Sequence, residues 1–187
     1  MIILGLSCYY HDSSACIIKD GVIVTAIAEE RLSRIKHDNG FPLKSIIHCL
    51  DTLGIAINEV DCIAFYEKPI LKFDRVIEQH LKHFPKSFGQ FYRTFPEWIK
   101  LRMNIQGTLR ASFNYVGEIQ YIEHHLAHAA SSYLSSSFKE ASILTIDGVG
   151  EWATTTKGYG KDNIINLTDQ INFPHSLGLL YSTVTAY

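Results

Sequence analysis

The stretch ASILTIDGVG at residues 141–150 decides the fold, because a β-branched apolar run ends there in Asp147 and a glycine-rich turn. The run Ile143–Ile146 predicts a buried strand, and the residues that follow it repeat the opening of the chain. In both places the order is strand, Asp-bearing loop, strand, Lys-Asp turn, strand and helix. Two units built alike indicate an internal duplication, with a boundary near residues 137–140.

The first unit opens with three apolar runs, and Lys19-Asp20-Gly21 between the second and third is a strong hairpin signal. Pro42 then begins a helix whose apolar residues recur at helical spacing, and Gly54 occupies the expected C-terminal cap. Further strands are predicted at Cys62–Tyr66 and Ile119–Ile122. This alternation of strands and helices places the chain in the α/β class.

The segment from Leu71 to Phe113 is mostly helical in pattern, with Pro85 and Pro96 as breakers. Its aromatic residues could form a binding stripe, but helical spacing more often marks packing, so we expect core or interlobe contact for Phe84, Phe88, Phe91, Tyr92, Phe95 and Trp98. We therefore predict a first lobe at residues 1–139 with a helical insertion at about residues 68–117. Residues 140–187 are the start of a second lobe, which we expect to be incomplete because its last helix has no cap.

The composition is that of an ordinary globular protein, with 47% hydrophobic residues, 19% charged residues and a formal net charge of −2. This balance gives no electrostatic reason to expect nucleic acid or an anionic membrane as a partner. The N-terminus has no signal-peptide pattern, and no apolar run approaches the roughly 20 residues of a membrane span. The four cysteines form no CxxC pair. We expect buried reduced thiols and a cytoplasmic protein.

The sequence EHHLAHAA at residues 123–130 carries the sharpest chemical signal. His124 and His128 are four residues apart on a predicted helix, so their imidazoles share one face and could bind a divalent metal. Asp147 at the end of the next strand completes a set of two histidines and one carboxylate, which suits Fe(II) and also accommodates zinc or manganese. A zinc protease is excluded, because His125 stands where such enzymes need Glu. The alternative is an incidental histidine pair in a non-catalytic interaction module.

Two other clusters contain candidate site residues. Gly148 and Gly150 form a tight turn that could bring backbone N–H groups to an anion, and Thr154–Thr156 follow it. An ordinary hairpin turn is the alternative interpretation of that cluster. His11 stands beside a carboxylate in the first loop and is a candidate general base. Lys36, in a later loop, suits a phosphate or carbonyl oxygen.

Taken together, these stretches resemble the NodU/CmcH family of carbamoyltransferases, which includes nodulation-factor and antibiotic O-carbamoyltransferases. The motifs that carry the resemblance occur in order along the chain, at His11–Ala15, Glu29–Asp38, Phe41-Pro42, His124–Ala130, Asp147–Glu151 and Ser176–Tyr181. The aromatic helical region from about Lys68 to Gly117 contains no matching motif.

The resemblance implies the actin-like, sugar-kinase-like ATPase fold, with two ribonuclease-H-like lobes and mixed sheets. In the full-length family a second domain makes carbamoyl adenylate from carbamoyl phosphate and ATP, and the domain represented here transfers the carbamoyl group to a hydroxyl of a small-molecule or glycan acceptor. By resemblance, His124, His128 and Asp147 hold an iron ion, His11 takes the acceptor's proton and Lys36 contacts the adenylate. Gly178 in the last helix either permits close approach of the adenylate or packs the helix.

The resemblance also leaves a related function open, the transfer of threonylcarbamoyl to tRNA on the same type of lobes. The near-neutral charge and the opening His-Asp-Ser-Ser at residues 11–14 disfavour this alternative. A chain that lacks the adenylate-forming domain and a further Asp ligand is expected to be inactive alone. The sequence predicts no particular oligomeric state.

Overall fold

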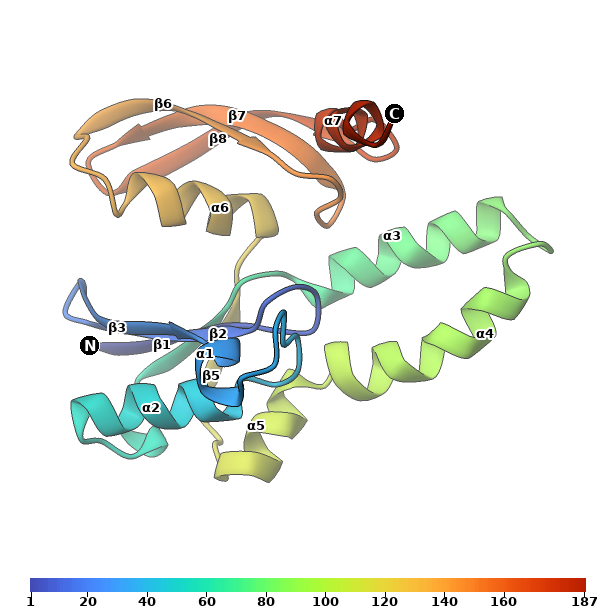
Figure 1. Ribbon diagram of the computed structural model, residues 1–187. Helices are drawn as coiled ribbons and strands as arrows, with labels where there is room; N and C mark the ends of the chain where they lie inside the picture. Colours follow the sequence, from blue (N-terminus) through green and yellow to red (C-terminus); the bar gives the residue numbers. More distant parts are fainter. The chain divides into compact units, whose positions relative to one another are not determined.

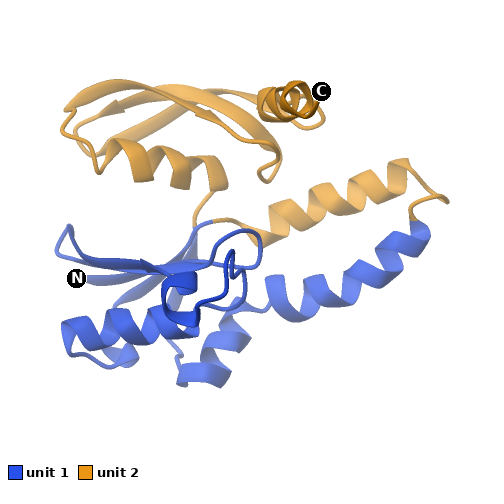
Figure 2. Cartoon of the chain, viewed as in Figure 1, with its two compact units in different colours: residues 1–66, 88–121 blue, residues 67–87, 122–187 orange.

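The computed structural model describes all residues from Met1 to Tyr187, which form two compact units. Figure 2 colours unit 1, residues 1–66 and 88–121, in blue and unit 2, residues 67–87 and 122–187, in orange. None of the helices combines the length and the apolar character that crossing a membrane requires.

Unit 1 is built on a mixed sheet of five strands in the order β3-β2-β1-β4-β5 (Figure 1). The strands are β1 (Ile2–Ser7), β2 (Ser14–Lys19), β3 (Val22–Ala28), β4 (Cys62–Phe65) and β5 (Glu118–Tyr121). The first three strands pair antiparallel, whereas β4 lies parallel to β1 and β5 lies parallel to β4. This arrangement confirms the predicted strands and the mixed sheet of unit 1.

Unit 1 also contains six helical elements. They are α1 (Glu29–Ser33), α2 (Leu43–Leu53), the 3₁₀ turn η1 (Ile57–Glu59), α4 (Phe88–Glu97), the π-helical turn η2 (Trp98–Arg102) and α5 (Ile105–Phe113). Helix α2 packs on β2 and β3 and buries Ile46, Cys49 and Leu50, which lie three and four residues apart. Gly54 ends it at φ 69°, a left-handed conformation that glycine adopts without strain.

The core contact expected for the aromatic segment is not found in α4, whereas the alternative, interlobe contact, stays a prediction. Helix α4 buries none of its residues, and Phe88 and Tyr92 are 57% and 73% exposed. The rings of α4 contact one another, with centroids 5.1 Å apart for Phe91 and Phe95 and 6.4 Å apart for Phe88 and Tyr92. Pro96 lies inside α4 and does not end it. Proline cannot donate the helical hydrogen bond, and a wider π turn follows at Trp98–Arg102.

Unit 2 contains an antiparallel sheet in the order β6-β7-β8, formed by β6 (Glu140–Ile146), β7 (Ala153–Lys161) and β8 (Ile164–Asn172). Its helices are α3 (Pro69–Lys82), α6 (His124–Tyr133) and α7 (Leu177–Ala186). Helix α6 lies along one face of this sheet, where Ala129 and Tyr133 pack on Ile143 (Figure 1). Alternate residues of β6 are buried by this contact.

The two sheets repeat one another in their first three strands, as the sequence predicts. Both are antiparallel meanders, and in both the second turn contains an aspartate in the left-handed region, Asp20 and Asp162, each at φ 51°. Aspartate tolerates this conformation better than most residues. Since α6 contacts β6, β7 and β8, it belongs to unit 2. The lobe boundary at residue 139 stays a prediction.

The four cysteines are free thiols, and Cys8 and Cys49 are buried. Burial raises the pKa of the Cys49 thiol to about 11, so at pH 8 only about one molecule in a thousand carries the reactive thiolate. We expect iodoacetamide to label Cys49 slowly in the native protein and rapidly after denaturation, as mass spectrometry of the peptides would show. Fast labelling of the native thiol would contradict the packing of α2.

Candidate metal centre

The structure brings together the three residues that the sequence proposes as metal ligands, all within unit 2. Helix α6 presents His124 and His128 on one face, and Asp147 follows the end of β6. His124 Nε2 lies 2.6 Å from Asp147 Oδ2 and 3.1 Å from His128 Nε2. His128 Nε2 lies 3.7 Å from the same carboxylate oxygen. The three ligand atoms therefore face one point.

The chemistry of this donor set fits a divalent transition metal. A hydrogen on His124 Nε2 can be shared well with only one of its two close partners, whereas a cation accepts a lone pair from all three atoms. Hydrogen bonds from His124 and then His128 hold the pKa of the Asp147 carboxyl far below its usual range, so the carboxylate is charged. His124 is buried, but the His128 side chain is 52% exposed. One side of the cluster is thus open to a ligand.

Glu151 fixes the start of α6, a role that sequence reasoning missed. Its buried carboxylate accepts hydrogen bonds from the backbone N–H groups of Lys68, at 2.5 Å, and His124. Arg75 donates to its backbone carbonyl. Because Glu123, the N-cap residue of α6, makes no side-chain cap, Glu151 supplies the acceptor that the helix start needs. Burial raises the pKa of the Glu151 carboxyl.

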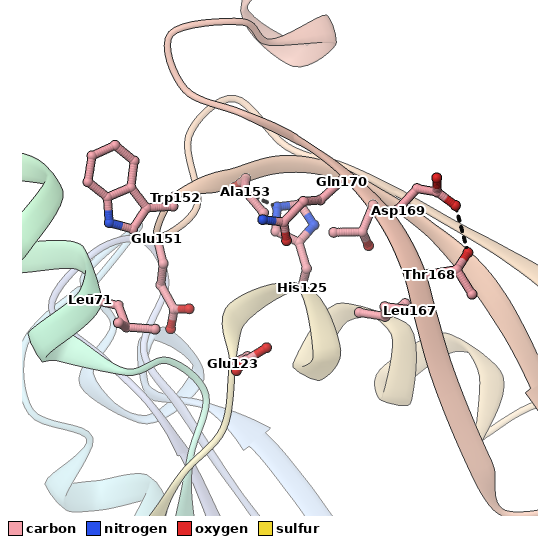
Figure 3. Close-up of a pocket in the computed structure, with 11 residues that line it drawn as sticks. Leu71, Glu123, His125, Glu151, Trp152, Ala153, Leu167, Thr168, Asp169 and Gln170 are labelled. Carbon is pink, nitrogen blue, oxygen red and sulfur yellow. Dashed lines mark hydrogen bonds between the residues drawn. The ribbon is translucent and has the colours of Figure 1, made fainter.

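His125 points away from the cluster, toward the sheet. Its Nε2 donates to the Ala153 carbonyl at 2.8 Å, the bond drawn in Figure 3, and its Nδ1 lies 2.5 Å from Thr145 Oγ1. Burial lowers the pKa of this imidazole, which favours the neutral ring. The residue that excluded a zinc protease is therefore a structural neighbour of the cluster and not part of its donor set.

Two glycines proposed to approach a cofactor lie against the cluster itself. A Cβ on Gly150 would lie 2.7 Å from Ala153 O and 3.0 Å from His124 Cδ2, and one on Gly178 would lie 2.5 Å from the Asp147 carbonyl carbon. Close packing therefore explains why glycine occupies both positions. Gly148 has room for a Cβ, 3.7 Å from Leu179. Its N–H donates to Asp147 Oδ1 at 2.6 Å, which occupies this donor in the structure.

Gly178 and Gly148 offer a matched pair of substitutions. Gly178→Ala forces the backbone of Asp147 or of α7 to move, so we expect it to reduce the free energy of unfolding by about 1–3 kcal/mol. Gly148→Ala adds the same methyl group at a position where it would make only an ordinary van der Waals contact. We therefore expect this substitution to change stability little. Thermal unfolding of the two variants tests this difference. Equal midpoints would show that α7 does not pack on the Asp147 loop.

Comparisons with known proteins bear on this site. A family model described as the carbamoyltransferase N-terminus matches residues 2–187. This chain belongs to the carbamoyltransferase family. It is 44% identical to the uncharacterized protein sll1178 of Synechocystis sp., over 99% of this chain and 31% of that protein. It is 32% identical to the nodulation protein NolNO of Sinorhizobium fredii, over 96% of this chain and 25% of NolNO. The chain thus spans about a third or less of the length of these relatives.

The solved structure of YeaZ from Pseudomonas aeruginosa resembles this carbamoyltransferase-family chain in fold, with a TM-score of 0.50 and 15% identity. The match covers 92% of this chain and 67% of YeaZ. This shared fold and the mixed sheet with its helices confirm the predicted α/β fold class.

The other two site residues proposed for this carbamoyltransferase-family chain, His11 and Lys36, lie in unit 1. Both are exposed and occupy loops that are hydrogen-bonded to each other. Ser13 N–H donates to Asp38 O at 2.7 Å, and His37 Nδ1 lies 2.8 Å from Asp12 Oδ1. The structure therefore brings the loop of His11 beside the loop of Lys36.

A cavity of about 380 Å³ lies within unit 2, where Glu123 and His125 at the start of α6 contribute to its wall (Figure 3). It is lined by Leu71, Glu123, His125, Glu151, Trp152, Ala153, Thr156, Leu167, Thr168, Asp169 and Gln170. Several polar groups of the wall are already paired within the protein, such as Glu123 with Lys68 at 2.9 Å. Its volume suits a small molecule, and its wall contains apolar, carboxylate and amide groups.

Proposed function

We propose that this chain carries the carbamoyl-transfer site of a metal-dependent O-carbamoyltransferase. The observation that supports this most directly is the cluster of His124, His128 and Asp147 in a member of the carbamoyltransferase family. The complete enzyme would form carbamoyl adenylate from carbamoyl phosphate and ATP. It would then move the carbamoyl group to a hydroxyl of a small molecule or glycan.

His124, His128 and Asp147 would hold the divalent metal, for which we propose Fe(II). When bound, such a cation supplies positive charge beside the adenylate phosphate, where negative charge grows during transfer. Asp147 contributes an ionised carboxylate, and the imidazoles contribute neutral nitrogen donors. The open side at His128 leaves room for an oxygen ligand.

His11 would act as the general base, because its imidazole is exposed in the loop between β1 and β2. It accepts the proton of the acceptor hydroxyl while that oxygen forms a bond to the carbamoyl carbon. The bond from this carbon to the phosphate oxygen breaks, and its electron pair leaves with AMP. The ammonium group of Lys36 would bind an oxygen of the adenylate. Gly150 and Gly178 would contribute close backbone packing at the metal cluster, and Gly148 would leave space for this ligand.

The test uses the full-length protein with carbamoyl phosphate, ATP and a panel of hydroxyl acceptors. We expect near-stoichiometric metal by elemental analysis and an ATP-dependent carbamoylated product by mass spectrometry. A protein that retains no metal and consumes no carbamoyl phosphate would overturn the proposal. Binding of tRNA with threonylcarbamoyl transfer would instead assign the chain to the related reaction.

A further inference from the structure

Behind the metal cluster, three buried polar side chains form a continuous hydrogen-bonded chain. They are His125 on α6, Thr145 on β6 and Thr156 on β7, which are 4%, 7% and 3% exposed. His125 Nδ1 lies 2.5 Å from Thr145 Oγ1, which in turn lies 2.7 Å from Thr156 Oγ1. The strand register explains the second contact, since Thr145 and Thr156 are direct cross-strand partners.

The backbone carbonyl of Ala153, which contacts the other nitrogen of His125, determines the direction of these hydrogen bonds. Ala153 O can only accept, so His125 Nε2 carries a hydrogen and donates it. In the neutral ring Nδ1 is then an acceptor, and the Thr145 hydroxyl donates to it. Thr145 receives in turn the hydroxyl hydrogen of Thr156. Each of the three side chains thereby has a hydrogen-bond partner, and the imidazole plane is held at both nitrogens.

The orientation of His125 determines where its neighbours point. Successive residues of an α-helix differ by about 100°, so holding His125 on the sheet turns His124 and His128 to another side of α6. That side faces Asp147, two residues beyond Thr145 on the same chain segment. The two strands that hold His125 therefore fix both histidine ligands relative to the carboxylate.

We propose that His125, held by Thr145 and Thr156, is a positioning residue that sets the metal affinity of the His124–His128–Asp147 cluster. This inference rests on the proposed metal centre. His125 does not touch the metal; it acts through the rotation of α6. Outer groups that orient metal ligands typically contribute about 10–100-fold to affinity.

Thr155 provides a matched control one residue away from Thr156. It is 5% exposed and belongs to the same strand β7, but its Oγ1 has no hydrogen-bond partner. Thr145→Val and Thr155→Val therefore make the same chemical change at two equally buried positions. Only the first removes a hydroxyl that holds His125.

The experiment measures the Co²⁺ dissociation constant of the metal-free full-length protein by competition with a chromophoric chelator. We expect Thr145→Val to weaken binding about tenfold or more, Thr155→Val to leave it unchanged and Thr145→Ser to restore it. As a readout without metal, NMR of labelled histidine should show His125 as the Nε2–H tautomer in the wild-type protein.

The outcomes separate the two proposals. Equal affinities for Thr145→Val and Thr155→Val, in a protein whose wild type binds Co²⁺, would overturn the positioning role and leave the metal centre intact. A loss of thermal stability in Thr145→Val with unchanged affinity would overturn it as well. A wild-type protein that binds no metal would overturn the metal centre itself, and the positioning role with it.

Discussion

Asp147→Asn in the full-length protein is expected to lower metal affinity more than about 100-fold and to abolish carbamoyl transfer. The substitution keeps the size of the side chain but removes the only carboxylate among the three clustered ligand atoms. The cluster then loses its negative charge, and an amide oxygen is a much weaker ligand for a transition metal. Metal content after gel filtration, measured by elemental analysis, provides the readout.

The matched control for this substitution is Asp51→Asn. Asp51 is exposed on α2 in unit 1, so the same change of charge there should leave metal content and transfer at the wild-type level. Thermal unfolding of the metal-free proteins checks that the fold of the Asp147→Asn variant persists. Full metal content in that variant would show that the ion binds elsewhere or that the cluster is not its site.

Local patterns predicted most of the fold. The apolar spacing of α2, the cap at Gly54 and the Lys-Asp turns were sufficient to locate their elements, because each depends on residues close in sequence. The same holds for the clustering of the three candidate metal ligands. A four-residue spacing on α6 and a strand-terminal Asp147 are local signals that the structure brings together.

Features that depend on distant contacts could not be predicted in this way. Glu151 caps α6 and binds the backbone of Lys68, which is 83 residues earlier. A contact over this separation leaves no periodic pattern in the sequence. The hydrogen bond between His125 and Thr145 depends on how α6 is positioned on the sheet, which the sequence pattern does not specify. The aromatic face of α4 has the spacing of a packed helix, yet no residue of α4 is buried. Helical periodicity identifies an apolar face but not what covers it.

His11→Ala is expected to slow carbamoyl transfer by about 10²–10⁴-fold, the usual contribution of a positioned general base. The residue lies in unit 1, on an exposed loop, where its ring contacts the ring of Tyr10. Stability, metal content and the formation of carbamoyl adenylate should therefore remain close to the wild type. Single-turnover transfer from preformed adenylate isolates the affected step, and His48→Ala, an exposed histidine on α2, is the control.

Chemical rescue sharpens the test of His11. If the missing imidazole is only a proton acceptor, added imidazole should recover part of the transfer rate in His11→Ala and have no effect on the wild type. Loss of adenylate binding with intact transfer would assign His11 to ligand binding instead. A wild-type transfer rate in His11→Ala would show that His11 is not the general base. Another group of the full-length enzyme would then accept the proton of the acceptor hydroxyl.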